Sequence, residues 1–241
     1  MPFAWNDDIK IHYRVEGDGT PLVIHHGLTG YAESWRAAGY FEPLQENYKL
    51  ILLDARGHGE SSKPHNPEDY SMKHMVGDVV AILDQLSVDK SLYWGYSLGG
   101  RVGLSVCKYA SDRFSGLIIG AMGADEWDTE ASMNRRKEME EASGGNFSDQ
   151  DRKHYNELDV EAMKAILTCN DHLGYEDFLP KNQIPTLIYC GDMDYYYPSA
   201  KRCSEIMPES KLVTLPGLDH DDAFSEVNLV LPHVLKFLKS I

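Results

Sequence analysis

Six short apolar runs, none of which alternates with polar residues, limit what this chain can fold into. They are LVIHH (22–26), LILLD (50–54), LYWGY (92–96), LIIGAM (117–122), TLIYC (186–190) and KLVTL (211–215). Continuous runs of this length, rich in Ile, Val, Leu and Tyr, are typical of strands buried on both faces of a parallel sheet. Residues 9–15 alternate instead, which predicts a half-buried strand near an edge of that sheet.

Segments with helical periodicity lie between these runs. In the segment 71–86 the apolar residues fall on one stripe of a helix, namely Met72, Met75, Val76, Val79, Val80, Leu83 and Leu86. The segments 99–110 and 228–238 are also predicted to be helical. Strand and helix therefore alternate, which predicts an α/β fold with a mainly parallel central sheet flanked by helices.

The stretch 124–180 breaks this alternation, because it is polar, helix-prone and without a strand-like run. A crossover between parallel strands needs only about a dozen residues, so the excess length favours a small helical cap over one end of the sheet. Ordinary crossover helices are the alternative. We expect residues 1–123 and 181–241 to form the core and residues 124–180 to form the cap.

Charge and composition narrow the class of partner. The chain has 241 residues, enough for one large core, and a formal net charge of −15. Such a surface repels phosphate backbones, so we expect no nucleic-acid partner. No run approaches the ~20 apolar residues that span a bilayer, and no signal peptide is apparent, so we expect no membrane insertion. The four scattered cysteines favour reduced thiols, no metal site and a cytoplasmic location. We expect a monomer or a homodimer.

One serine stands between glycines directly after a predicted buried strand, in Gly95-Tyr96-Ser97-Leu98-Gly99. A strand-to-helix turn this sharp leaves no room for side chains two residues before and two residues after the serine. The turn exposes the hydroxyl at the edge of the sheet. It also points the N-terminus of the next helix at the reacting group, which favours developing negative charge. The pattern indicates a nucleophile elbow rather than a chance G-x-S-x-G in a loop.

A serine hydroxyl needs a base to take its proton and an acid to orient that base. In a sheet with this elbow the acid and the histidine follow later strands, in the chain order Ser, Asp/Glu, His. The run TLIYC is followed by GDMDYYYP (191–198), and the run KLVTL by PGLDHDDAF (216–224). Asp194 and His220 therefore lie on the loops where a triad with Ser97 needs them. Asp192 is a rival acid, with a turn-stabilising carboxylate as its other interpretation.

Five segments, HHGLTG, DARGHGES, GYSLGG, GDMDYYYP and GLDH, occur in the order found in α/β-hydrolase fold proteins. The chain resembles the short-capped members of this superfamily over essentially its whole length outside the predicted cap. The resemblance implies Ser97 as nucleophile, Asp194 as acid and His220 as general base and acid, with no cofactor. The family places the acid at the fourth position of G-x-x-D, which favours Asp194 over Asp192. Asp125 is a second alternative, because some relatives carry the acid one strand earlier.

Two backbone amides are needed to bind the oxygen of a tetrahedral intermediate. Leu98, directly after the serine, supplies one of them. Leu28 follows His26-Gly27 as the oxyanion residue of the family does, and is expected to supply the other. The loop reads HGLTG rather than the HGGG of lipases and esterases that handle bulky alcohol groups. This departure disfavours such substrates.

The remaining motif residues divide into structural and pocket-lining candidates. The DARGHGES segment (54–61) and the histidines at 26 and 58 are expected to be structural. The three aspartates at 219, 221 and 222 flank His220, and we expect them to face solvent. Five residues are candidates for contact with substrate, although each also suits the core: Trp35, Tyr96, Met122, Trp127 and Tyr195.

The motifs together predict a serine hydrolase that cleaves carboxylic esters of small to medium acyl groups through an acyl-enzyme on Ser97. The expected partner is a small-molecule ester. Lactonase, thioesterase and carbon–carbon bond hydrolase chemistries use the same triad and are alternatives. A serine at the elbow excludes haloalkane dehalogenases and epoxide hydrolases, which need a carboxylate there. A ligand receptor with little turnover is a further alternative from a different class.

Overall fold

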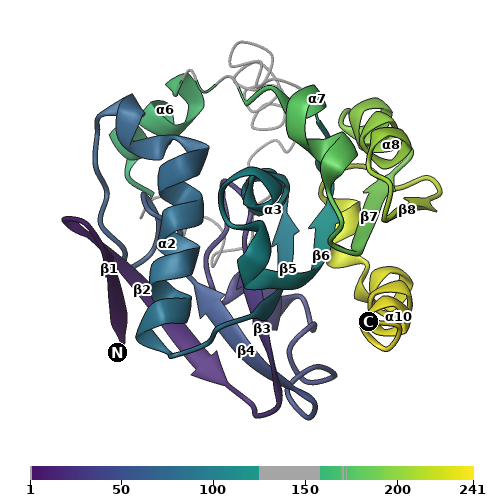
Figure 1. The fold of residues 1–241 in the computed structure, drawn as a ribbon, viewed down its shortest axis with the longest axis horizontal. Coiled ribbons are helices and arrows are strands. Elements are labelled where there is room, and N and C mark those ends of the chain that lie inside the picture. Colours follow the sequence, from purple (N-terminus) through teal and green to yellow (C-terminus); the bar gives the residue numbers. More distant parts are fainter. Residues whose placement is uncertain (1, 125–157, 170, 172) are drawn as a thin grey trace, which may run out of the picture.

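The computed structural model describes residues 2–124, 158–169, 171 and 173–241. Within this part of the chain lies an eight-stranded sheet with the order β1-β2-β4-β3-β5-β6-β7-β8 (Figure 1). The strands are β1 (Phe3–Asn6), β2 (Ile9–Glu16), β3 (Thr20–His25), β4 (Tyr48–Leu53), β5 (Ser91–Tyr96), β6 (Phe114–Gly120), β7 (Thr186–Gly191) and β8 (Ser210–Leu215). The β1–β2 and β2–β4 pairs are antiparallel, and all later pairs are parallel.

Each of the six apolar runs forms one of the strands β3 to β8, as predicted. In β5 and β7 every position is buried, which explains why their sequences do not alternate. β8 lies at an edge of the sheet and is partly exposed along its length. The alternating segment forms β2, one strand in from the opposite edge.

The edge strand β1 was not predicted from the sequence. It pairs with β2 through a two-residue turn, since Asn6 is opposite Ile9 and only Asp7 and Asp8 lie between them. Asp7 has a φ of 51°, the left-handed conformation that such tight hairpin turns require and that aspartate tolerates. A strand of four residues is too short to show a period.

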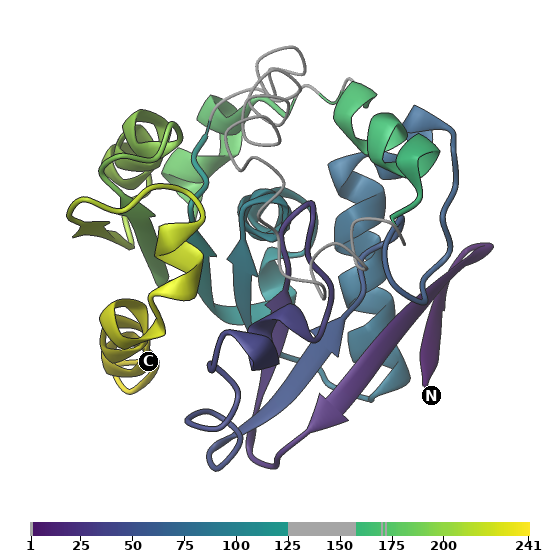
Figure 2. The same cartoon turned by 180° about the vertical axis from the view of Figure 1, so that it is seen from behind.

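Helices cover both faces of the sheet and divide the core into two clusters. They are α1 (Ser34–Ala37), α2 (Met72–Gln85), α3 (Leu98–Tyr109), α6 (Val160–Thr168), α7 (Tyr175–Phe178), α8 (Tyr197–Ile206), α9 (Asp222–Ser225) and α10 (Val227–Leu238). Apolar residues of α2, α3 and α8 pack on one face, in front of the sheet in Figure 1. Those of α1 and α10 pack on the reverse face, which is seen in Figure 2. The predicted helices 71–86, 99–110 and 228–238 correspond to α2, α3 and α10.

The predicted cap, 124–180, is only partly within the described residues. Its described part contains α6, α7 and the first residues of the short 3₁₀ helix η3 (Leu179–Lys181), and no strand. α6 begins at an N-cap aspartate, Asp159, whose carboxylate accepts the amide of Ala162. Its apolar side belongs to the same hydrophobic cluster as α2 and α3. The division into a core and a separate cap stays a prediction.

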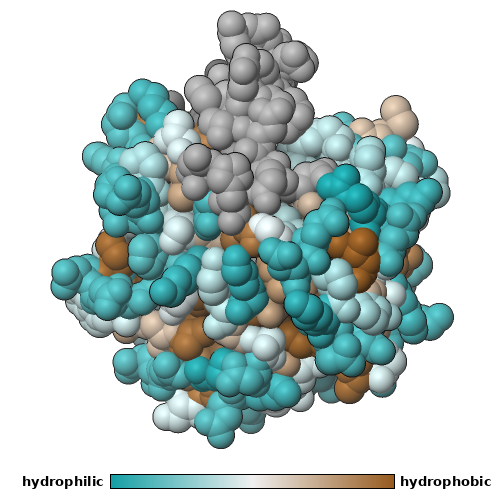
Figure 3. All heavy atoms as spheres, turned by 45° about the horizontal axis from the view of Figure 1, so that its top comes forward, coloured by the Kyte–Doolittle hydropathy of each residue, from teal (hydrophilic) through white to brown (hydrophobic). Residues whose placement is uncertain are grey.

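The surface agrees with the acidic, polar composition. On the face drawn in Figure 3, hydrophobic residues form separate small patches within a hydrophilic surface. In the parts of the chain that the structure describes, we find no helix that combines the length and apolar character needed to cross a membrane.

The parallel strands end at one common edge of the sheet. The loops that follow β3, β5, β7 and β8 therefore meet there, although they are far apart in the sequence. These four loops carry HHGLTG, the serine, GDMDYYYP and GLDH. This edge is where the candidate site is assembled.

Candidate active site

Ser97 occupies a strained turn between β5 and α3. Its φ of 52° and ψ of −112° lie outside the regions that residues other than glycine usually adopt. A Cβ at Gly95 would lie 2.1 Å from the carbonyl oxygen of Gly99, and a Cβ at Gly99 would lie 2.4 Å from the carbonyl oxygen of His25. Both glycines are therefore required by steric contacts, as the sequence predicted. The turn places Ser97 at the N-terminus of α3.

The three residues predicted to form a triad are hydrogen-bonded to one another. His220, between β8 and α9, has its Nε2 3.0 Å from Oγ of Ser97. Its Nδ1 lies 2.8 Å from Oδ2 of Asp194, on the loop after β7. The side chain of Asp194 is fully buried, whereas that of His220 is 15% exposed. With the proton on Nδ1 donated to Asp194, Nε2 is free to accept from the serine hydroxyl.

Asp194 is held in place by its own loop. Its Oδ1 accepts the amide of Tyr196 at 2.8 Å, so both carboxylate oxygens are bonded. Asp192 has a different role, because its Oδ1 accepts the amide of Gly217 at 2.7 Å and ties two loops together. The alternative acid Asp125 lies outside the described residues.

Cys190, near the end of β7, is a neighbour of Asp194 that was not predicted from the sequence. Burial raises the pKa of its thiol, and the charge of Asp194 and a hydrogen bond to that carboxylate raise it further. The thiol is therefore protonated at neutral pH and leaves the charge of this region on the acid. Its sequence position gives no signal of this contact beyond closeness to GDMD.

The loop after β3 passes directly beside the nucleophile. A Cβ at Gly27 would lie 3.4 Å from the Cβ of Ser97. The carbonyl of His26 accepts the amide of Gly99 at 3.1 Å, and His58 donates from Nε2 to the carbonyl of Leu28 at 2.5 Å. These contacts join the loop that carries Leu28 to the elbow that carries Leu98. The two amides proposed for oxyanion binding therefore belong to neighbouring, hydrogen-bonded loops.

The histidines of this region form buried contacts of the loops, as expected for His26 and His58. Nδ1 of His26 donates to the carbonyl of Gly27, and its Nε2 accepts the amide of Ala55. Burial, followed by the nearby rings of His58 and His25, holds the pKa of His26 well below its usual value. Burial also lowers the pKa of His25 to about 4. His25 and His26 are therefore neutral at neutral pH, and their hydrogen bonds fix the loop.

The DARGHGES segment is also structural, as predicted. Nε of Arg56 donates to Oδ2 of the buried Asp78 in α2, at 2.6 Å, and its Nη2 contacts Oδ1. The carboxylate of Asp54 accepts bonds from His12, from the amide of Ala32 and from the amide of Glu60. Both side chains thus hold loops rather than face the serine.

Of the five candidates for substrate contact, two are buried in the core and one lies outside the described residues. Trp35, a candidate for substrate contact that also suits the core, is buried on the reverse face of the sheet, with its ring 4.9 Å from Trp94 and 5.1 Å from Phe224 between centroids. This burial agrees with the core interpretation of Trp35, because α1 places the side chain in the second core cluster. Met122 is likewise buried, in the cluster beneath α3. Trp127 lies outside the described residues.

Two of the candidates do lie at the site. Tyr195 is 41% exposed and its ring stacks on that of His220, with centroids 5.2 Å apart and planes 26° apart. Tyr96 also contacts His220, but it is buried, so its side chain does not face the substrate.

The aspartates at 219, 221 and 222 are exposed, as expected. Oδ1 of Asp219 accepts the amides of Asp221 and Asp222 and so shapes the start of α9.

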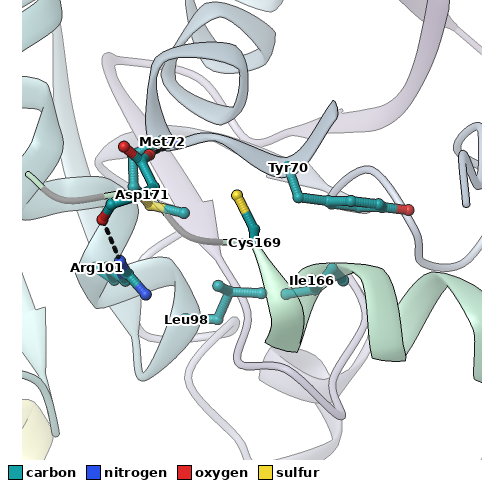
Figure 4. A pocket seen from close by; sticks show the side chains of 7 residues that line it. All are labelled: Tyr70, Met72, Leu98, Arg101, Ile166, Cys169 and Asp171. Carbon is teal, nitrogen blue, oxygen red and sulfur yellow. Dashed lines mark hydrogen bonds between the residues drawn. The ribbon is translucent and has the colours of Figure 1, made fainter. Parts of the chain in front are cut away.

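A small cavity adjoins the elbow on the α2 and α3 side. Its volume is about 10 Å³, and its lining residues are Tyr70, Met72, Leu98, Arg101, Ile166, Cys169 and Asp171 (Figure 4). Arg101 of α3 donates from Nη2 to the carbonyl of Asp171 at 3.2 Å across it. A space of this volume holds roughly one water molecule.

Comparison with known proteins places this arrangement in a family. A model of the alpha/beta hydrolase fold matches residues 20–158. A bifunctional esterase/perhydrolase from Acinetobacter calcoaceticus is 24% identical over 97% of this chain and 98% of its own. A non-heme haloperoxidase from Rhodococcus erythropolis is 25% identical over the full length of both chains. An enol-lactonase from Burkholderia xenovorans LB400 superposes with a TM-score of 0.83, covering 99% of this chain and 100% of its own, at 19% identity. The chain belongs to the alpha/beta hydrolase fold family.

Proposed function

We propose that this protein is a carboxylic ester hydrolase that acts through an acyl-enzyme on Ser97. The observation that carries the proposal is the continuous hydrogen-bonded chain from Asp194 through His220 to the Ser97 hydroxyl, with distances of 2.8 and 3.0 Å. A relative named as an esterase/perhydrolase, which is 24% identical over 97% of this chain, supports the same reaction class.

The reaction proceeds in two halves. His220 takes the hydroxyl proton on Nε2 as Ser97 Oγ bonds to the acyl carbon, and the carbonyl electron pair moves onto oxygen. The amides of Leu28 and Leu98 stabilise that oxyanion, and Asp194 stabilises the imidazolium. The imidazolium then gives its proton to the departing alcohol as the carbon–oxygen bond breaks. Water, deprotonated by His220, attacks the acyl-enzyme, and Ser97 leaves with the proton.

The decisive experiment replaces the nucleophile. Ser97→Ala is expected to lower kcat/KM for p-nitrophenyl acetate and butyrate by about 10⁴-fold or more. Ser105→Ala is the matched control, because Ser105 lies two turns further along α3 and its buried hydroxyl donates to the carbonyl of Arg101. That variant should keep near wild-type activity. Wild-type turnover by Ser97→Ala would refute the proposal.

A covalent probe and a substrate panel separate the remaining possibilities. A fluorophosphonate should label wild-type protein on Ser97 and leave Ser97→Ala unlabelled. Values of kcat/KM for matched esters, lactones and thioesters then rank the acyl substrates. A receptor role predicts labelling with negligible turnover of every member of the panel.

A further inference from the structure

Tyr96 connects the strand that carries the nucleophile to the loop that carries the base. It is the last residue of β5 and directly precedes Ser97. Its hydroxyl donates to the backbone carbonyl of His220 at 2.5 Å, and its ring lies 5.5 Å from the imidazole between centroids. One side chain therefore bridges two segments that are 124 positions apart in the sequence.

The packing of the ring alone would suit an ordinary core tyrosine. The ring contacts Phe224 and Tyr189, with centroids 5.0 and 6.1 Å apart, and Tyr96 is only 4% exposed. The hydroxyl adds a hydrogen bond that this packing does not require. Its acceptor belongs to His220 itself, so the bond fixes the backbone from which the imidazole projects.

The backbone of His220 needs such a restraint. It lies between the edge strand β8 and the four-residue helix α9, in a segment whose aspartates at 219, 221 and 222 are exposed. Asp194 holds the ring at Nδ1 and Tyr195 stacks on it, but neither contact fixes the backbone from which the ring projects. Displacement of a reacting group by about 1 Å can lower a rate by about 10²-fold.

We propose that Tyr96 is a positioning residue for the general base, which sets the distance between His220 Nε2 and Ser97 Oγ by binding the His220 carbonyl. The inference rests on the proposed function, since it assigns His220 the role of base. Tyr96 neither forms a bond to the substrate nor transfers a proton in that scheme. Its phenol stays a donor across the working pH range, because burial, followed by the nearby Tyr189 and Asp194, raises its pKa well above the usual value.

The structure offers a matched control in Tyr40. Its hydroxyl donates to the backbone carbonyl of Phe224 at 2.8 Å, four residues beyond His220 in the same segment. Tyr40→Phe and Tyr96→Phe each delete one buried hydroxyl from a tyrosine bonded to this segment. Their effects on the melting temperature should be similar, but only the second change frees the carbonyl of the base.

The test compares the two variants with p-nitrophenyl acetate. Tyr96→Phe should lower kcat by about 10-fold or more and change KM by less than about two-fold, because the substrate contacts are kept and the base is misplaced. The rate of fluorophosphonate labelling should fall in parallel. Tyr40→Phe should keep kcat within about two-fold of wild type. Equal kcat values for the two variants would overturn the proposal.

Two non-natural residues at position 96 keep the test decisive even if Tyr96→Phe does not fold. p-Aminophenylalanine retains a donor at the para position, and p-methylphenylalanine fills the same space without one. The amino variant should recover most of kcat and the methyl variant should not. Equal activity of the two would refute a role for the hydrogen bond.

The outcome is distinguishable from failure of the proposed function. If Ser97→Ala is inactive and Tyr96→Phe has wild-type kcat, the positioning role is wrong and the serine mechanism stands. If Ser97→Ala is active, the serine mechanism itself is wrong, whatever the effect at Tyr96.

Discussion

Two aspartate–histidine pairs in this protein have the same geometry and different surroundings. In the first, Nδ1 of His12 lies 2.8 Å from Oδ2 of Asp54. In the second, Nδ1 of His220 lies 2.8 Å from Oδ2 of Asp194. Both carboxylates are buried, with side-chain exposures of 6% and 0%. The same atoms thus meet at the same distance in both pairs.

The difference lies at the other nitrogen of each ring. Nε2 of His12 is buried and has no hydrogen-bond partner among the described residues, and its ring lies beside that of Phe3. Nε2 of His220 faces the hydroxyl of Ser97 at the partly exposed edge of the sheet. The pair of His12 and Asp54 therefore joins strand β2 to the loop after β4 and has no further partner at Nε2 among the described residues. An aspartate–histidine pair can become catalytic only where the second nitrogen meets an accessible nucleophile.

The largest expected effect comes from changing the acid of the second pair. Asp194→Asn presents an amide N–H to Nδ1 of His220, which favours the tautomer with its proton on Nε2. That nitrogen can then no longer accept from Ser97, and kcat should fall by about 10⁴-fold. The fold should be kept, because an asparagine Oδ1 can still accept the amide of Tyr196. Steady-state kinetics with p-nitrophenyl butyrate measures the loss.

Asp192→Asn is the control for this change, because Asp192 lies two residues away on the same loop and bonds Gly217 instead of His220. Its kcat should stay close to that of the wild type. A large loss in Asp192→Asn, with activity retained in Asp194→Asn, would move the acid to Asp192.

The corresponding change in the first pair should act on stability. Asp54→Asn removes a buried charge that binds His12 and the amides of Ala32 and Glu60, which should lower the free energy of unfolding by about 3 kcal/mol. The kcat of the folded enzyme should change little. Urea denaturation and active-site titration measure the two quantities separately. A 10⁴-fold loss of kcat here would make the two pairs equivalent and remove the distinction.

The effect of Asp54 should also depend on pH. Burial raises the pKa of its carboxyl, but the hydrogen bonds from His12 and from the amides of Ala32 and Glu60 outweigh burial and hold the pKa below its usual value. As the pH falls, the carboxylate of Asp54 is therefore protonated in the unfolded state before it is protonated in the folded state. The contribution of Asp54 to stability is complete above about pH 4 and is lost at lower pH. The unfolding free energies of wild type and Asp54→Asn should approach each other there.

Local chemistry made much of the fold and site predictable from sequence. The apolar runs at β3 to β8 are continuous because these strands lie between two core clusters. A continuous run can be recognised from the sequence of one strand alone. Gly95 and Gly99 are likewise demanded by contacts within a single turn. The loops that carry Asp194 and His220 follow from strand order, since parallel strands end at the same edge. The strand runs and the two glycines can each be recognised from residues that are close together in the sequence, and the loops follow from the order of the strands.

The parts that sequence did not predict depend on contacts between distant residues. Trp35 has no periodic neighbours in the four-residue helix α1, so nothing local shows that it faces the core. The bond between the Tyr96 hydroxyl and the His220 carbonyl could be predicted only if the positions of the end of β5 and of the loop after β8 were known to within a few ångströms. The pairing of His12 with Asp54 crosses two antiparallel strands and was also not predicted.

The smallest expected effect is that of a change at His12, and it is best measured against the same change at His220. In His12→Asn and His220→Asn, the asparagine Nδ2 takes the place of the imidazole Nδ1, so each can keep a bond to its carboxylate while Nε2 is lost. His12→Asn should leave kcat unchanged and lower the free energy of unfolding by about 1–2 kcal/mol, because part of a buried ring is removed. His220→Asn should abolish turnover with little change in stability. If both variants lost activity alike, the position of Nε2 could not be what separates a structural pair from a catalytic one.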